Sequence, residues 1–163
     1  MLEKLSSYNL FTNLFPGVVF CFFADKYLSY PLIQEDFVVG IFLYYFVGLV
    51  ISRIGSVVIE PLLIWAGILK YASYGDYVAA SKKDSKIDLL LETNNMYRSA
   101  TSLFACMALL LFFDLLKTSF VLVEQYYVPI LVALFLALFV LSYRKQTNYI
   151  RKRIEANGSS ENK

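Results

Sequence analysis

Residues 37–69 read FVVGIFLYYFVGLVISRIGSVVIEPLLIWAGIL, and only Arg53 and Glu60 among them carry a charge. The sixteen uncharged positions before Arg53 cover about 24 Å at 1.5 Å per residue, less than the hydrocarbon layer of about 30 Å. We therefore expect a membrane-spanning helix over residues 37–59, with Arg53 near one boundary of the bilayer. Because proline cannot continue the helical hydrogen-bond ladder, we expect Glu60-Pro61 to end this helix.

The composition of the whole chain is typical of an integral membrane protein. Of its 163 residues, 58% are apolar and 17% are aromatic, whereas soluble proteins are about 45–50% apolar. The formal net charge of +2 is close to neutral, so nucleic acid is not an expected partner. Cys21 and Cys106 both lie in apolar runs, where we expect buried thiols and no disulfide.

Three further apolar runs bring the expected number of membrane spans to four. They cover residues 5–24, 99–116 and 125–143, each close to the length that one helix needs to cross the bilayer. The sequence thus predicts an all-α integral membrane protein with four transmembrane helices. We expect one membrane domain over residues 1–156 and a disordered tail over residues 157–163, where Asn, Gly and Ser are expected to end the last helix.

The first of these runs begins with an unusually polar section. Asn9 and Asn13 are four residues apart, so their amides share a helix face and are expected to meet another helix or interfacial water. Pro16 removes one backbone donor and bends whatever helix contains it. Two interpretations are open: an interfacial helix that bends into the membrane, or a mobile gate at Pro16-Gly17.

The only long region outside the expected spans is residues 61–98. Its first part is rich in tyrosine and contains the single tryptophan, Trp65, a composition that suits the lipid headgroup layer. Beyond Lys82 the chain is more polar, and apolar residues such as Ile87 and Leu90 recur at helical spacing. We expect a cytoplasmic or interfacial amphipathic helix that continues directly into the third span.

The positions of lysine and arginine predict the orientation in the membrane. The connections at residues 25–36 and 117–124 hold one lysine each, whereas residues 53–98 hold six basic residues and the segment after Tyr143 holds six more. Basic residues accumulate on the cytoplasmic side of membrane proteins. Both termini and the central region are therefore expected to be cytoplasmic.

The chain lacks the residues on which most enzymatic sites depend. It contains no histidine, which excludes imidazole ligands and imidazole general bases. Walker A, GxGxxG and CxxC patterns are also missing from the sequence. We expect no catalytic residue, no metal and no cofactor, and we do not expect an enzyme.

Ionisable side chains near the bilayer are the candidate contacts with lipid or with a partner. Arg53 and Glu60 are seven residues apart, on one helix face but too distant to pair directly. Arg53 has three open interpretations: an anionic lipid headgroup, an acid on a neighbouring helix or subunit, or an ion pathway. The basic segment after the fourth span is expected to bind the inner leaflet, a nucleic acid being the alternative. The predicted contact residues are Arg53, Glu60, Arg144, Lys145, Arg151, Lys152 and Arg153.

Small residues on the second span allow another backbone to come close. Gly40 and Gly48 lie on roughly one face, and Ser52 extends that face by one turn. They serve either packing within one chain or self-association. We predict a homo-oligomer whose contact face comprises Asn9, Asn13, Gly40, Gly48 and Ser52.

Two sequence runs and the broken second span resemble a known kind of protein. The runs SYNLFTNLFPGVVF at residues 7–20 and NNMYRS at residues 94–99 look like parts of small bacterial inner-membrane proteins from anti-phage defence loci, such as the membrane subunit of Kiwa-type systems. The resemblance implies an oligomeric inner-membrane subunit that works with a cytosolic partner in sensing or damaging the infected cell's membrane. It carries over no functional residue.

Two functions are therefore expected to compete. In the first, the chain is a membrane-anchored subunit whose residues 71–98 dock a soluble protein partner. In the second, an oligomer forms a holin-like or channel-like pore, which needs a polar helix face, and only the first span with Asn9, Thr12 and Asn13 approaches one. We expect the first function, with membrane lipids as the other partner.

Overall fold

The computed structural model describes the backbone of residues 10–116 and 121–161, and all regular elements in these ranges are helical. This confirms the predicted all-α class. The elements, in which η denotes a π-helical turn, are η1 (Leu10–Leu14), α2 (Phe15–Leu28), α3 (Phe37–Ile54), η2 (Gly55–Ile59), α4 (Glu60–Trp65), α5 (Tyr74–Ser81), α6 (Lys86–Leu116) and α7 (Val121–Glu161).

Three helical stretches are long and apolar enough to cross a membrane: Phe37–Trp65, Lys86–Leu115 and Pro129–Ala156. They correspond to the second, third and fourth predicted spans. In the most apolar window of the last one, only 6% of the residues are buried, so most of its apolar side chains are accessible on the surface of the chain. Such apolar surface is stable in lipid, whereas soluble proteins rarely expose so much of it.

The first predicted span, residues 5–24, begins outside the described residues. Its described part belongs to the helix formed by η1 and α2, which continues past the expected end at Asp25 to Leu28. Ser29 then adopts a left-handed conformation with φ of 58° and turns the chain. This helix is not among the three long apolar stretches.

The second span continues through Pro61, so the prediction that Glu60-Pro61 ends the helix is wrong. The chain remains helical from α3 through η2 to the end of α4 at Trp65. The π-helical turn explains this continuity, because its wider ring makes room in the helix immediately before the proline. Pro61 then occupies the first turn of α4, where proline is tolerated.

The last helix also continues beyond its predicted end. Residues 157–160 were expected to form the start of a disordered tail, but α7 includes them and runs to Glu161. Once a helix is nucleated, each added residue gains a backbone hydrogen bond at little further cost. Glycine and asparagine at the end of a helix of 41 residues therefore do not suffice to stop it. The helix α6 runs without a break from Lys86 to Leu116, through the region of the third predicted span.

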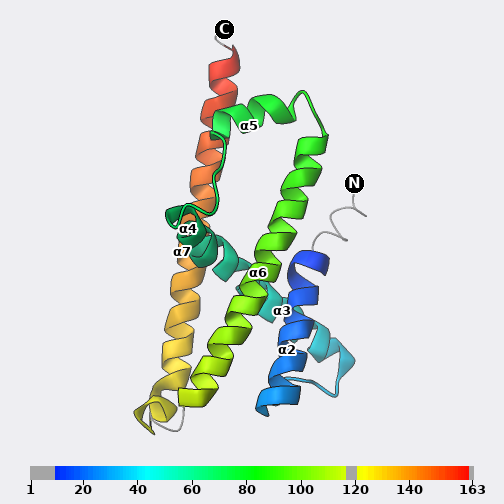
Figure 1. Ribbon diagram of the computed structural model, residues 1–163, viewed down its shortest axis with the longest axis vertical. Coiled ribbons are helices and arrows are strands. Elements are labelled where there is room, and N and C mark those ends of the chain that lie inside the picture. Colours follow the sequence, from blue (N-terminus) through cyan, green and yellow to red (C-terminus); the bar gives the residue numbers. More distant parts are fainter. Residues whose placement is uncertain (1–9, 117–120, 162–163) are drawn as a thin grey trace.

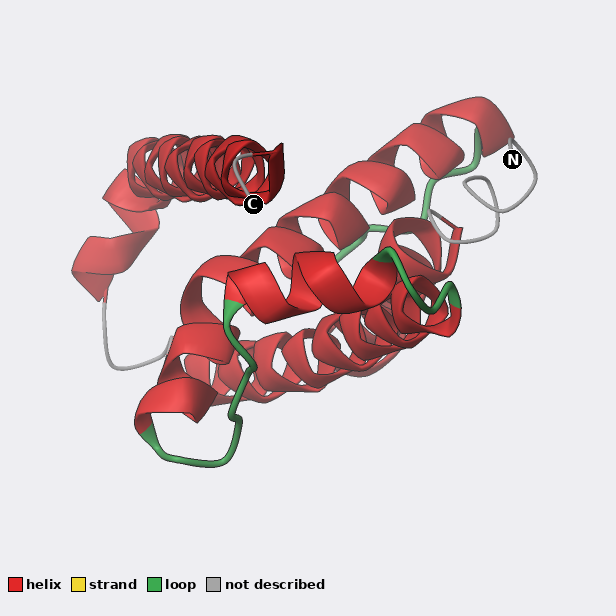
Figure 2. Ribbon diagram, turned by 90° about the horizontal axis from the view of Figure 1, so that it is seen from above, coloured by secondary structure: helices red, strands yellow, loops and turns green. Residues whose placement is uncertain are grey.

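The helices form an open arrangement in which α3 crosses α6 and α7 (Figure 1). The helices α6 and α7 both follow the long axis, and α2 packs against α3 and α6 beside them. At the upper end α5 lies across the gap and contacts both α6 and α7. Seen from above, the helix that bears the C-terminus points toward the viewer while most other helices run across the picture (Figure 2).

The crossing of α2 and α3 depends on two glycines. A Cβ atom on Gly48 would lie 1.6 Å from the carbonyl oxygen of Asn13, and one on Gly17 would lie 1.7 Å from the carbonyl oxygen of Tyr44. Neither distance leaves room for any side chain. The two backbones are thus in direct contact, as in other membrane helix pairs that meet at small residues.

The predicted oligomer face therefore lies mostly inside one chain. Asn13, Gly48 and Ser52 are buried by α2, α3 and α6, and Gly40 packs against the ring of Tyr44 in its own helix. Asn9 is outside the described residues. Packing within the chain, the first of the two interpretations, accounts for the small residues, and a second copy could reach Gly48 only after α2 had left α3. Oligomerisation stays a prediction.

Candidate functional site: a polar cluster and a basic cavity where three helices meet

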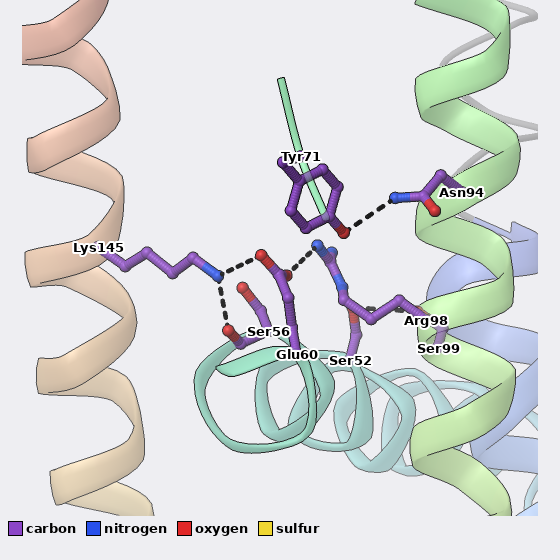
Figure 3. A network of polar contacts seen from close by, with 8 residues as sticks. All are labelled: Ser52, Ser56, Glu60, Tyr71, Asn94, Arg98, Ser99 and Lys145. Atoms are coloured by element: carbon purple, nitrogen blue, oxygen red, sulfur yellow. Dashed lines mark hydrogen bonds and ion pairs between the residues drawn. The ribbon is translucent and has the colours of Figure 1, made fainter. Parts of the chain in front are cut away.

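Three ionisable side chains from three different helices meet in one polar network (Figure 3). Glu60 on α4 accepts a hydrogen bond at 3.0 Å from Nη1 of Arg98 on α6, and its other oxygen lies 3.2 Å from Nζ of Lys145 on α7. The Glu60 side chain is only 9% exposed. We refer to these three residues as the Glu60 cluster. It joins the three long helices through one buried carboxylate.

Lys145 has a second acceptor that the π-helical turn makes available. The N–H of Glu60 donates to the carbonyl of Gly55, five residues back, and Pro61 has no N–H to offer the next carbonyl along the turn. That next carbonyl belongs to Ser56, and it accepts a hydrogen bond of 2.6 Å from Nζ of Lys145. Pro61 and the π-helical turn thus create a backbone site for the lysine.

Small polar residues bring α6 close enough for Arg98 to reach Glu60. The hydroxyl of Ser102 donates to the carbonyl of Ile51 at 2.7 Å, and that of Ser99 donates to Ser52 at 3.4 Å. A Cβ atom on Gly55 would lie only 3.1 Å from the Ser102 Cβ. All three serines are fully buried, so their hydrogen bonds satisfy groups that would otherwise be costly at membrane depth.

A basic cavity of about 370 Å³ adjoins the cluster, between the η2–α4 segment and α7. Its lining combines an apolar part with a part rich in nitrogen donors. The lining residues are Ser56, Val57, Pro61, Leu141, Arg144, Lys145, Asn148, Tyr149 and Lys152. No carboxylate belongs to this set, whereas three of the nine side chains are cationic. The cavity is thus suited to an anion.

Above the cluster, α5 connects the upper parts of α6 and α7. Ser73 caps its first turn by accepting from the N–H of Asp76 at 3.1 Å. The hydroxyl of Tyr77 donates to Asp88 on α6 at 3.2 Å, and the ring of Tyr74 lies 6.1 Å from that of Tyr149 on α7. Burial, followed by the hydrogen bond to the Asp88 carboxylate, raises the pKa of Tyr77. The tyrosine therefore stays a neutral donor over the physiological range.

The structure separates the predicted contact residues into distinct environments. Glu60 and Lys145 belong to the Glu60 cluster, and Arg144 and Lys152 line the basic cavity. Arg53 is half-buried on α3. Further along α7, Arg151 pairs with Glu155 at 3.6 Å on the exposed surface, and Arg153 is exposed.

Sequence reasoning missed Arg98 as the partner of Glu60. The signal that could have found it is topological: Arg98 is the last charge before the third span, and Lys145 follows the fourth span closely. With the predicted orientation, both lie at the same membrane boundary as Glu60. The serines of α6 carry no comparable signal, since serine is common on either side of such a boundary.

No family model, curated protein or solved structure matches this chain. The resemblance to membrane subunits of anti-phage defence loci therefore rests on the residues quoted above.

Proposed function

We propose that the chain is a non-enzymatic subunit of the bacterial inner membrane that presents a rigid helical frame to a cytosolic protein partner, in an antiviral defence system. The frame consists of α5, residues 86–98 of α6 and residues 144–161 of α7. The observation that carries the proposal is that apolar side chains are exposed on this polar, projecting part of the molecule. Leu89 and Leu90 on α6 are 58% and 66% exposed, and Ile154 on α7 is 67% exposed.

Helix lengths support a frame that projects from the membrane. At 1.5 Å per residue, α6 with its 31 residues is about 46 Å long and α7 with its 41 residues is about 61 Å long. The hydrocarbon layer is only about 30 Å thick, so roughly 15 Å of α6 and roughly 30 Å of α7 extend beyond it. The projecting parts are the ones that carry charge, since Arg98 and Arg144 mark where the uncharged runs end.

A helix with solvent-exposed leucines commonly binds in a hydrophobic groove of a partner protein. Exposed apolar residues on the frame lose their contact with water when a partner covers them, and a few such residues supply most of the binding energy. Leu89 and Leu90 lie within the segment that the sequence assigns to partner docking, residues 71–98. The Glu60 cluster and α5 hold this segment in place, which lowers the entropy lost on binding.

Substituting Leu90 with aspartate is expected to weaken docking by about 30-fold, because a hot-spot residue contributes about 2 kcal/mol and the charge opposes burial. The measurement is co-purification of the full chain with each soluble protein encoded by the neighbouring genes, followed by titration of the purified pair. Ile33→Asp is the matched control, since Ile33 is also exposed but lies in the α2–α3 loop. Equal binding by Leu90→Asp and the wild type would refute this docking surface.

We further propose four spans with both termini in the cytoplasm. The arrangement in Figure 1 supports this, because α5 and the end of α7 lie at the upper end while the end of α6 and the start of α7 lie at the lower end. A cysteine replacing Ser85, between α5 and α6, is expected to react with a membrane-impermeant maleimide only from the cytoplasmic side. A cysteine replacing Glu35, in the α2–α3 loop, should react only from the outside. The background carries Cys21→Ala and Cys106→Ala, and labelling of both sites from one side would contradict the topology.

The pore remains the alternative function, but no observation on the described residues favours it. The polar residues it requires, Thr12 and Asn13, are buried, and the amide of Asn13 donates to the hydroxyl of Tyr45 at 3.5 Å. Expression of the chain without any partner separates the two functions. Prompt membrane depolarisation would favour the pore, and an unchanged membrane potential would favour the docking subunit.

A further inference from the structure

The basic cavity has more cationic side chains than nearby carboxylates to pair with them. Its lining includes Arg144, Lys145 and Lys152. A fourth cation, Arg98, pairs with Glu60, which also pairs with Lys145. Glu60 supplies one negative charge that two of these four cations share. Arg144 and Lys152 form no ion pair with any described residue, so the local excess of charge is positive.

The lining of the cavity matches an amphipathic anion. Arg144, Lys152 and the amide of Asn148 can donate hydrogen bonds to phosphate oxygens, and charge-assisted bonds of this kind are the strongest that side chains form. Val57, Pro61 and Leu141 form the apolar part of the lining. A ligand with a charged head and an apolar body would contact both parts at once. The volume of about 370 Å³ lies within the range of small-molecule sites.

The position of the cavity along α7 indicates whether the phosphate belongs to a lipid or to a soluble compound. Leu141 belongs to the apolar part of the helix and Arg144 begins its basic part, so the cavity lies at the boundary between hydrocarbon and headgroups. From these observations we infer that the cavity binds the phosphate of an anionic phospholipid in the cytoplasmic leaflet, with the acyl chains leaving past Leu141. Arg144 and Lys152 hold the phosphate, and the Glu60 cluster positions Lys145 beside it.

The test is a lipid titration of the full chain in detergent, read by native mass spectrometry. The probes are phosphatidylglycerol, phosphatidylcholine and inorganic phosphate. The wild type is expected to retain phosphatidylglycerol at least tenfold better than phosphatidylcholine. In Arg144→Gln with Lys152→Gln, binding of phosphatidylglycerol should fall by about 30-fold, which corresponds to about 1 kcal/mol for each charge.

The matched control is Arg151→Gln with Arg153→Gln, which removes the same charge from the same helix without touching the cavity lining. It should keep wild-type binding if the cavity, and not the general charge of α7, holds the lipid. A second variant, Val57→Trp, fills the cavity without changing any charge and should also lose the lipid. Circular dichroism shows whether each variant keeps its helices.

Three outcomes would overturn the inference. An equal loss of phosphatidylglycerol binding in Arg144→Gln with Lys152→Gln and in the control Arg151→Gln with Arg153→Gln would mean nonspecific attraction to basic residues. Unchanged lipid binding in both Arg144→Gln with Lys152→Gln and Val57→Trp would mean that the cavity is not the site. If inorganic phosphate binds with the same affinity as phosphatidylglycerol, the cavity is a site for a soluble phosphate compound and not for a lipid. The inference rests on the proposed insertion in the membrane but not on the docked protein, so the co-purification test can succeed or fail independently.

Discussion

Replacement of Glu60 by alanine is expected to lower the free energy of unfolding by about 3–5 kcal/mol, the usual effect of removing one partner from a buried ion pair. The carboxylate is nearly inaccessible and pairs with both Arg98 and Lys145, which are themselves mostly covered. Without it, two cations from different helices face each other at close range. Equilibrium unfolding of the purified chain in detergent, followed by helical circular dichroism, measures the effect.

Two comparisons make the result specific to the Glu60 cluster. Glu155→Ala removes an exposed carboxylate that pairs with Arg151 one helical turn away, and such a surface pair contributes at most about 1 kcal/mol. Glu60→Gln keeps the shape of the side chain and one of its two acceptor oxygens, so it should lose less stability than alanine. If Glu60→Ala destabilises no more than Glu155→Ala, the cluster does not hold the three helices together.

Gly48→Ala is expected to cost about 2–3 kcal/mol or more, because it places a methyl group where the Asn13 carbonyl already lies. The obstacle is backbone and not a flexible side chain, so α2 has to move away from α3 as a whole. That movement would uncover the buried polar side chains Thr12 and Asn13 at the crossing. Thermal unfolding in detergent should show a lower transition temperature for the variant.

Gly40→Ala is the control on the same helix. The atoms nearest to its Cβ atom would belong to the side chain of Tyr44, the first at 3.2 Å, and a ring can shift by a few tenths of an ångström. Alanine also favours the helix over glycine by about 1 kcal/mol, so this variant should be close to the wild type or more stable. Equal destabilisation by Gly40→Ala and Gly48→Ala would mean that the Gly17–Gly48 contact is not what limits the approach of α2.

Apolar run lengths carried most of the fold prediction. The uncharged stretches before Arg53, after Arg98 and before Arg144 each lie within one of the long apolar helices, since membrane helices must satisfy their backbone internally. Helix ends were harder to predict. Pro61 was predicted to break the helix, but the effect of a proline depends on the turn before it. A π-helical turn has no sequence signature that separates it from an ordinary turn, so the continuation could not be predicted.

The candidate site was predicted as separate residues and not as an arrangement. Glu60 and Lys145 stood out because a charge near the bilayer needs a partner, but they are far apart in the sequence and only the crossing of α3 with α7 brings them together. Gly48 was recognised as a point of close approach, yet a small residue does not identify the helix that uses it. Here the neighbour is α2 of the same chain.

The crossing of α3 with α7 also has a mechanical consequence. The Glu60 cluster fixes α7 at Lys145, and beyond this point the helix continues for about 24 Å to Glu161 at 1.5 Å per residue. Below it, the helix lies in the apolar region, where its tilt follows the thickness of the bilayer. Beyond this point Tyr74 of α5 contacts Tyr149 of α7, so a tilt of α7 about Lys145 carries α5 with it. A tilt of about 10° moves the far end of α7 by about 4 Å, given the rise per residue of a straight helix. Thinning of the membrane would thus be read out as a displacement at the tip of the frame.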